Sequence, residues 1–427
     1  MTFVTRWSST LWLVMAGCGG ATPTAADPTN LPSTPGAAAQ GDAAPGANAS
    51  PAAPAGNAGP CIAEVAAGDA FTCARKGDGS LWCWGLNADG QLGVGDAVDR
   101  WSPSEVSALG NGVAAIAAGA SHACALLGDG SVRCWGNNDA GQLGDGTRSA
   151  HSVPAPVGGV EDALQIVVGN QHSCARRASG TVVCWGSSRA GQLGNGVAGA
   201  NAFSATPVEV GGLPGADELA ARGDHTCARS GEQVRCWGDD SSGQLGDGES
   251  GAGAYQPSPI LVANLGGGAA GLTVGGAHSC ARLSDGSVRC WGNNSSGQLG
   301  LGYVSYGSAT AVPTPQALPM VVARALSAGQ AHTCAIAADG SLQCWGVNGR
   351  GQLGRGDFTQ AVERGVPTPS TVPLTAVLTV AAGATHTCAR VGDGSLACWG
   401  GNRVGELGIG ANDADLPSPT SVSLVCP

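Results

Sequence analysis

The chain has 427 residues, with 72 Gly and 24 Pro, and only 12% of its residues are charged. Its formal net charge is −11 and Lys76 is its only lysine, so it is a poor candidate for nucleic-acid binding, which depends on neutralising phosphates. Glycine at this density, without a strict three-residue period, excludes collagen and disfavours long helices. The composition indicates many short strands and many turns.

The N-terminal residues have the pattern of an export signal. Residues 1–17 contain one positive charge, Arg6, and an apolar run over 11–16 that is too short to span a bilayer as a helix. Cys18 follows two small residues, a pattern that resembles the bacterial lipoprotein signal, in which this cysteine carries the lipid. Met15 departs from that pattern, and a simple cleaved signal is the alternative. We expect 1–17 to be a signal peptide and Cys18 to be lipidated.

Residues 18–60 have the composition of a flexible tether. Ala, Pro, Gly, Thr, Ser and Asn dominate, and Asp27 and Asp42 are the only charged residues. Such a segment cannot bury enough apolar surface to offset its conformational entropy. We expect an exported protein whose lipid anchor holds it at a bacterial outer membrane or cell surface.

From residue 61 to residue 427 the chain repeats with a period of 50 to 54 residues. Each copy contains a Cys-Trp-Gly triplet followed by Gly-Gln-Leu-Gly, which reads Gly-Glu-Leu-Gly in the seventh copy. An apolar run, a hairpin around Asp-Gly, a segment directly after Gly-Gln-Leu-Gly and a last segment near Pro indicate short strands. Four such strands per copy predict an all-β fold, a seven-bladed β-propeller of about 52-residue repeats with four-stranded blades.

The repeat resembles that of the regulator of chromosome condensation family. The shared features are Ala-Gly-x-x-His-Ser/Thr, Asp-Gly-x-Val, Trp-Gly-x-Asn and Gly-Gln-Leu-Gly, which recur over residues 61–427. The resemblance implies a seven-bladed propeller. Animal members that exchange the nucleotide of a small GTPase are intracellular and carry an added wedge beside the blades. No copy here contains such an insertion and the chain carries an export signal, so we do not expect exchange activity.

Fourteen of the 17 cysteines form seven pairs within the copies. Cys290 lies ten positions after Cys280, and a three-residue loop with Gly286 in a G1 bulge places the two opposite each other on paired strands. In the fourth copy Cys236 lies only nine positions after Cys227, and a two-residue loop restores the register. The predicted disulfides are Cys73–Cys83, Cys124–Cys134, Cys174–Cys184, Cys227–Cys236, Cys280–Cys290, Cys334–Cys344 and Cys388–Cys398.

Zinc bound by His278, Cys280 and Cys290 is the alternative, but export favours disulfides, and we expect neither a metal nor a cofactor. Of the cysteines outside the copies, Cys61 and Cys426 align where one blade would continue into the next. We therefore expect a Cys61–Cys426 disulfide that closes the ring, which leaves Cys18 for lipid.

Histidine and tryptophan recur at fixed repeat positions. Six of the seven histidines share one position, where the first copy has Phe71, and seven tryptophans follow the third-strand cysteines. Residues that recur in every blade are structural rather than catalytic, and we expect both sets between blades. A ring of exposed stacking tryptophans is the alternative. Arg222-Gly-Asp224 spells an adhesion tripeptide, which we interpret as chance in a glycine-rich chain.

The exceptions to the repeat are the candidate binding residues. They lie between Gly-Gln-Leu-Gly and the following Pro, in segments that vary in length and project to one side of a propeller. Aromatic residues and Arg on variable loops favour a protein or glycan contact, although some could fold back over blade edges. These residues are Trp101, Arg148, His151, Phe203, Tyr255, Tyr303, Tyr306 and Phe358.

We therefore expect a non-enzymatic, surface-tethered binding scaffold that acts as a monomer. Its partner would be a protein or a glycan, not nucleic acid, and it would meet the membrane only through its lipid anchor. The alternative is an enzyme that acts at the central opening of the propeller, which a cluster of carboxylates at one end of the channel would favour.

Overall fold

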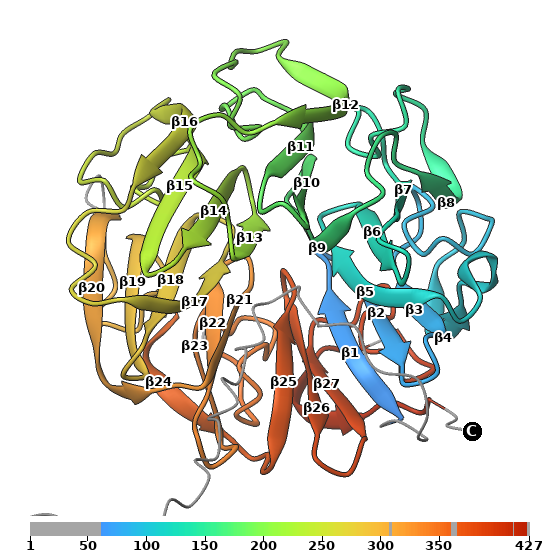
Figure 1. The fold of residues 1–427 in the computed structure, drawn as a ribbon. Helices are drawn as coiled ribbons and strands as arrows, with labels where there is room; N and C mark the ends of the chain where they lie inside the picture. Colours follow the sequence, from blue (N-terminus) through green and yellow to red (C-terminus); the bar gives the residue numbers. More distant parts are fainter. Residues whose placement is uncertain (1–60, 307–309, 360–364, 413, 425–427) are drawn as a thin grey trace, which may run out of the picture. The chain divides into compact units, whose positions relative to one another are not determined.

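The computed structural model describes residues 61–306, 310–359, 365–412 and 414–424. Over these residues the chain forms seven four-stranded antiparallel sheets. Each sheet contains four consecutive strands that pair in chain order, and the sheets stand around one axis as the blades of a propeller (Figure 1). The seven-bladed propeller is thus confirmed. The predicted signal peptide and tether lie outside the described residues. Within those residues, no helix is long and apolar enough to cross a membrane.

The strand bounds follow the repeat. The first two blades are β1 (Ile62–Ala67), β2 (Phe71–Lys76), β3 (Leu81–Gly85) and β4 (Arg100–Glu105), then the 3-10 helix η1 (Ser107–Leu109), and β5 (Val113–Ala118), β6 (His122–Leu127), β7 (Val132–Gly136) and β8 (His151–Pro156). The third and fourth are β9 (Ala163–Val168), β10 (His172–Arg177), β11 (Val182–Ser187) and β12 (Phe203–Glu209), then β13 (Glu218–Arg222), β14 (His225–Ser230), β15 (Gln233–Asp239) and β16 (Tyr255–Leu261).

The remaining three blades repeat the order. The fifth blade is β17 (Ala269–Val274), β18 (His278–Leu283), β19 (Ser287–Asn293) and β20 (Ala311–Val322). The sixth and seventh are β21 (Ala325–Ala328), β22 (His332–Ile336), β23 (Leu342–Gly346) and β24 (Val366–Val372), then β25 (Val377–Ala382), β26 (His386–Val391), β27 (Leu396–Gly400) and β28 (Leu416–Ser421).

The first strand of every blade faces the centre and the fourth is the outer edge (Figure 1). Proline is concentrated on the outer strands, where a residue without an N–H group does not interrupt a ladder. One expectation was wrong: the segment directly after Gly-Gln-Leu-Gly is a turn and not a strand. In the second blade Gly144 and Gly146 have positive φ angles of 70° and 85°, which bend the chain out of an extended conformation.

All seven hairpin disulfides that the sequence predicts are present. Each joins the second and third strands of one blade, with the two Cα atoms 4.1 Å apart. In the fourth blade Cys227 faces Cys236 because Gly231, with φ 58°, opens a two-residue turn there. Seven disulfides are consistent with an extracellular protein.

The seven repeat tryptophans are fully buried between blades. Each indole N–H donates a hydrogen bond to the main-chain carbonyl of the second residue of Gly-Gln-Leu-Gly in the preceding blade. The N–O distance is 2.9 Å from Trp135 to Gln91, and it is also 2.9 Å from Trp84 to Glu406, where the last blade meets the first. The glycine that ends the motif is required, because a Cβ on Gly93 would lie 2.7 Å from the Trp135 ring.

The six repeat histidines form a second set of contacts between blades. Nε2 of each lies 2.8 or 2.9 Å from the hydroxyl of a Ser or Thr in the next blade. The Thr333 hydroxyl donates its own proton to the carbonyl of Gln298, so His278 must donate Nε2–H to Thr333. Burial lowers the pKa of His278 to about 3, which keeps the imidazole neutral. The structural interpretation of these histidines is therefore confirmed.

The first blade replaces this contact with an apolar one. Phe71 occupies the histidine position, and the next blade has Ala123 where the others have Ser or Thr. Both residues are fully buried. A Ser at position 123 would face a ring that cannot exchange a hydrogen bond with it, so the two exceptions are matched.

The first and last blades meet through the same contacts as any other neighbours. The N–H of Gly410 donates to the carbonyl of Trp101 over 2.8 Å, as Gly95 does to Ser152 over 2.9 Å. Cys61 packs in one cluster with Leu424, so the described ends of the ring lie together. Cys61 is disulfide-bonded. Its predicted partner Cys426 lies outside the described residues, so the Cys61–Cys426 pair stays a prediction.

Replacing Phe71 by His and Ala123 by Ser should create the seventh histidine–hydroxyl bond. We expect Phe71→His alone to lower the free energy of unfolding by about 1–3 kcal/mol, because it buries an imidazole without a partner. The double variant should recover about 1 kcal/mol relative to the sum of the single variants. Denaturant unfolding of the four proteins measures this coupling, and additive effects would contradict it.

Closure by Cys61 should contribute more to stability than one hairpin disulfide. The chain-entropy model gives roughly 6 kcal/mol for a loop of this length and roughly 2.5 kcal/mol for a hairpin loop, the first being an upper figure because other disulfides remain in the denatured chain. Cys61→Ala should therefore lower the melting temperature more than Cys280→Ala with Cys290→Ala, in unfolding scans without reductant. An equal or smaller loss would mean that the ends are not joined.

Candidate functional site

Two faces of the propeller differ in what they carry. Because the strands of a blade alternate in direction, the connection between its third and fourth strands lies on the same side as the connection between its first and second strands. We call this side the loop face, and the side with the Asp-Gly hairpins the hairpin face. The third-to-fourth connections of the seven blades are 86–99, 137–150, 188–202, 240–254, 294–310, 347–365 and 401–415.

The predicted binding residues all lie at the loop face. Arg148, Tyr303, Tyr306 and Phe358 are in the connections, whereas Trp101, His151, Phe203 and Tyr255 lie at the start of outer strands. The aromatic side chains are 42–64% exposed. A large part of each ring is therefore available for contact. Trp101 also packs against Gly405 of the last blade and Phe203 against Arg148 of the second blade, so these two cover the edge of a neighbouring blade as well.

Two of the eight residues have local structural roles. The carbonyl of Trp101 accepts the hydrogen bond from Gly410, so this residue is where the outer strand of the first blade meets the last blade. His151 Nε2 lies 2.8 Å from the carboxylate of Asp145 in its own connection. Burial opposes ionisation of Asp145, but hydrogen bonds from Thr147 and His151 prevail and lower its pKa.

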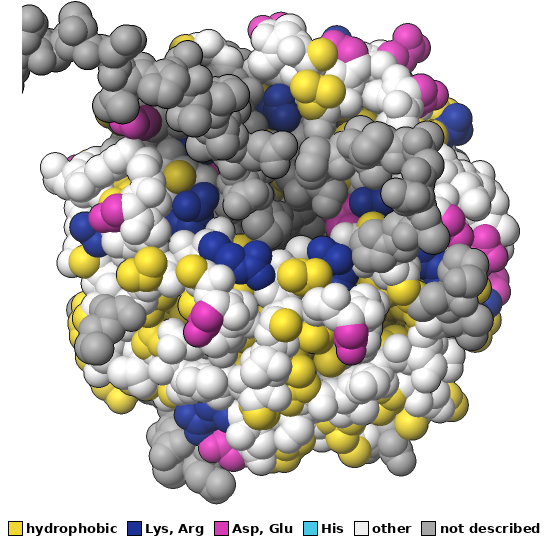
Figure 2. All heavy atoms as spheres, turned by 60° about the horizontal axis from the view of Figure 1, so that its bottom comes forward, with side chains coloured by type: hydrophobic (Ala, Val, Ile, Leu, Met, Phe, Trp, Pro, Cys, Tyr) yellow, Lys and Arg dark blue, Asp and Glu magenta, His cyan; other side chains and the backbone are white. Residues whose placement is uncertain are grey.

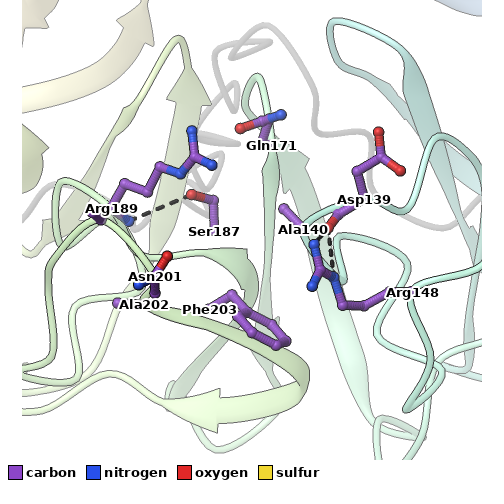
Figure 3. A pocket seen from close by; sticks show the side chains of 10 residues that line it. Asp139, Ala140, Arg148, Gln171, Ser187, Arg189, Asn201, Ala202 and Phe203 are labelled. Carbon is purple, nitrogen blue, oxygen red and sulfur yellow. Dashed lines mark hydrogen bonds between the residues drawn. The ribbon is translucent and has the colours of Figure 1, made fainter.

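A pocket of about 380 Å³ opens between the second and third blades and contains Arg148 and Phe203 (Figure 3). The guanidinium of Arg148 lies over the Phe203 ring, 4.8 Å from its centroid, and its Nε donates to the carbonyl of Asp139 over 2.6 Å. Arg189 extends over the pocket toward Gln171 from the opposite wall (Figure 3). The pocket thus brings together Arg148 and Phe203, which the sequence predicted. Asp139, Gln171 and Arg189, which it did not predict, also line the pocket.

The pocket has the composition of a polar recognition site. The two guanidinium groups and the amides of Gln171 and Asn201 offer hydrogen-bond donors. The ring of Phe203 offers one flat apolar surface. The carboxylate of Asp139 on its rim offers acceptors. Such a site fits an extended polar segment, with an acidic side chain between the two arginines. In the described part of the chain, no group of three His, Cys, Asp or Glu residues could hold a metal ion.

Part of this site could have been found in the sequence. Arg189 and Asp139 occupy the same repeat position, two residues before Gly-Gln-Leu-Gly, and this position differs among the copies. The four aromatic residues Tyr255, Tyr303, Tyr306 and Phe358 remain on three separate blades. The sequence indicated these four residues as a binding patch, whereas the pocket forms between the second and third blades of the same face.

The central channel offers little space at its loop-face end. Arg222, the last residue of β13 in the fourth blade, reaches across the channel and donates to the carbonyl of Ala382 in the seventh blade over 2.9 Å. It also pairs with Asp69 of the first blade at 3.1 Å. The cavity that it borders holds about 20 Å³ and is lined mainly by Ala and Val. This volume suits a single water molecule and not a substrate.

Comparison with known proteins agrees with the fold. Residues 162–426 match the RCC1-like domain, and 78–126 and 129–176 match the Regulator of chromosome condensation (RCC1) repeat. The chain is 31% identical to the ultraviolet-B receptor UVR8 of Arabidopsis thaliana, over 84% of this chain and 69% of the receptor. It is 28% identical to the protein pim1 of Schizosaccharomyces pombe, over 80% of this chain and 70% of pim1.

Among solved structures, Prp20p of Saccharomyces cerevisiae superposes with a TM-score of 0.71 at 24% identity, covering 83% of this chain and 86% of that chain. The match thus extends over nearly the whole ring, in sequence as well as in structure. The chain belongs to the regulator of chromosome condensation repeat family.

Proposed function

We propose that the chain is a non-enzymatic, surface-tethered scaffold that binds a protein partner through its loop face. The observation that carries the proposal is the pocket between the second and third blades, where Arg148, Arg189 and Phe203 converge. Arginine and aromatic side chains in recesses are typical anchors of protein interfaces. The exposed tyrosines of the fourth and fifth blades extend the same face, and Tyr is enriched at such interfaces.

The family supports a protein partner over a glycan. The solved structure of Prp20p describes its binding properties to Gsp1p and histones, and yeast RCC1 (Prp20) has been solved bound to Kap60. Those proteins share the propeller fold. In such a fold, the variable loops on one face form a surface that a partner can contact. We do not extend nucleotide exchange to this chain, because the copies lack the added wedge.

The enzyme alternative is less well supported. An active site at the central opening would need space for a substrate and a convergent set of catalytic groups. The loop-face end of the channel instead contains Arg222, which is paired with Asp69 and lies across a cavity of about 20 Å³.

Double substitution of Arg148→Ala with Phe203→Ala should weaken binding to the partner. Anchors of this kind contribute 2 kcal/mol or more, so we expect a loss of roughly thirtyfold or more in affinity. The partner would be isolated by photo-crosslinking from position 201 and its affinity measured by calorimetry. The matched control is Lys76→Ala with Trp82→Ala, which removes a cation–aromatic pair beside the hairpin of the first blade, on the opposite face. Equal affinity of all three proteins, or capture of a glycan, would contradict the proposal.

The tether is tested separately. If Cys18 carries lipid, Cys18→Ser should move the protein from the membrane fraction to the soluble fraction, because one membrane anchor is removed. Labelling with palmitate in growing cells should follow the same pattern. A variant that stays in the membrane fraction would refute lipidation while leaving the binding proposal intact.

A further inference from the structure

A set of arginines recurs on the hairpin side of the propeller. In five of the seven blades the residue four positions after the repeat histidine position is Arg, and in the second and sixth blades it is Leu126 and Ile336. Each of the five pairs in register with a residue of the innermost strand of its own blade. The five are Arg75, Arg176, Arg229, Arg282 and Arg390.

These residues stand around the hairpin-face end of the channel. Equal register places them at one height along the propeller axis, one strand out from the innermost strands. The sixth blade contributes Arg324, which donates to the carbonyl of Val377 in the seventh blade. Figure 2 shows several Lys and Arg side chains close to the middle of the face that it draws. We call these six residues the arginine ring.

Carboxylates balance only part of this charge. Arg75 pairs with Glu64 at 3.3 Å, and Arg229 pairs with Glu218 at 3.0 Å. Arg176, Arg282 and Arg390, in contrast, have no salt bridge to any described residue. Asp217 and Glu218 act on Arg176 only from beyond salt-bridge distance. Nη2 of Arg282 donates to the carbonyl of Ala270 over 2.7 Å. The Nε atoms of these three arginines are buried and have no hydrogen-bond partner in the described structure. The ring therefore carries an excess of positive charge in a chain whose net charge is −11.

The arginines are also near enough to repel one another. Burial lowers the pKa of Arg390, and the charges of Arg75 and Arg324 in the two neighbouring blades lower it further. Burial likewise lowers the pKa of Arg282, with Glu218 acting against it and Arg229 adding to it. Half-buried guanidinium groups are screened by solvent less than exposed ones, so this repulsion persists at physiological salt.

We propose that the arginine ring binds a ligand that carries several phosphate groups. A guanidinium group offers paired N–H donors that match the oxygens of a phosphate. The donors come from successive blades, so one compact ligand with several phosphates could meet several of them. The cavity at the loop-face end of the channel holds only about 20 Å³, so such a ligand would stay at the hairpin-face end.

Two sources share this chemistry, namely a soluble polyphosphate and the phosphate headgroups of a membrane. Inorganic tripolyphosphate is the probe for the first, titrated into the full chain by calorimetry at about 0.15 M salt. Phosphatidylcholine vesicles with and without phosphatidic acid are the probe for the second, in a flotation assay. Binding to tripolyphosphate alone supports a soluble ligand. Vesicle binding that depends on phosphatidic acid and is displaced by tripolyphosphate supports a headgroup. Binding to neither overturns the proposal.

The matched variants remove the same charge from two places. Arg176→Gln, Arg282→Gln and Arg390→Gln together remove the three second-strand arginines that have no salt bridge to a described residue. We expect tripolyphosphate affinity to fall roughly a hundredfold, since charge-assisted hydrogen bonds are lost. The control combines Arg133→Gln, Arg235→Gln and Arg289→Gln, which lie on third strands farther from the axis. This control should bind like the parent, and equal loss in both triple variants would reduce the effect to net charge and overturn the proposal.

Folding of the ring variant is checked by its melting temperature, which should equal or exceed that of the parent because repulsion is removed. If the triple variant fails to fold, the three single substitutions replace it, each with an expected loss of roughly fivefold. Single variants that all bind like the parent would also overturn the proposal. Arg148→Ala with Phe203→Ala, on the loop face, should leave tripolyphosphate binding unchanged, which separates this inference from the proposed protein-binding site.

Discussion

One main-chain carbonyl in each blade determines how the next blade docks. It belongs to the second residue of Gly-Gln-Leu-Gly, and it accepts the indole N–H of the neighbouring tryptophan in all seven interfaces. In five of them it also accepts a Ser or Thr hydroxyl, which in turn receives the histidine N–H. Because the acceptor is main chain, Glu406 serves as well as glutamine, and the motif tolerates that change.

The same docking rule explains why the sequence was so informative about the fold. Cysteine pairs nine or ten residues apart specify the register of every hairpin, and the register held even in the fourth blade, where one residue is missing. Phe71 and Ala123 each depart from the repeat in the sequence. Only the structure shows that they match, because it places the residue after the histidine position against the histidine position of the preceding blade. The failed expectation, a strand directly after Gly-Gln-Leu-Gly, arose because short polar segments between glycines resemble weak strands.

Function was harder to predict, for a physical reason. A pocket between blades depends on how residues some 50 positions apart in sequence come together, as Arg148 and Phe203 do across an interface. Single-copy exceptions indicated which face would vary, and the exposed aromatic residues are there. They did not indicate that Arg189 and Gln171 would complete a recess, because each lies in a different connection of the third blade. The arginines at the opposite face were hidden by their regularity, since recurrence was interpreted as structural.

Every blade is built from four strands that are contiguous in the chain. Among the described strands, none crosses the junction between the last blade and the first. That junction uses the same tryptophan–carbonyl and glycine–carbonyl hydrogen bonds as the other six. The geometry of the ring therefore does not depend on which blade is synthesised first. Cys61 and Leu424 already lie in one cluster, so the two described ends of the ring could be joined and the chain opened between any two other blades. The fold is, in this sense, indifferent to circular permutation.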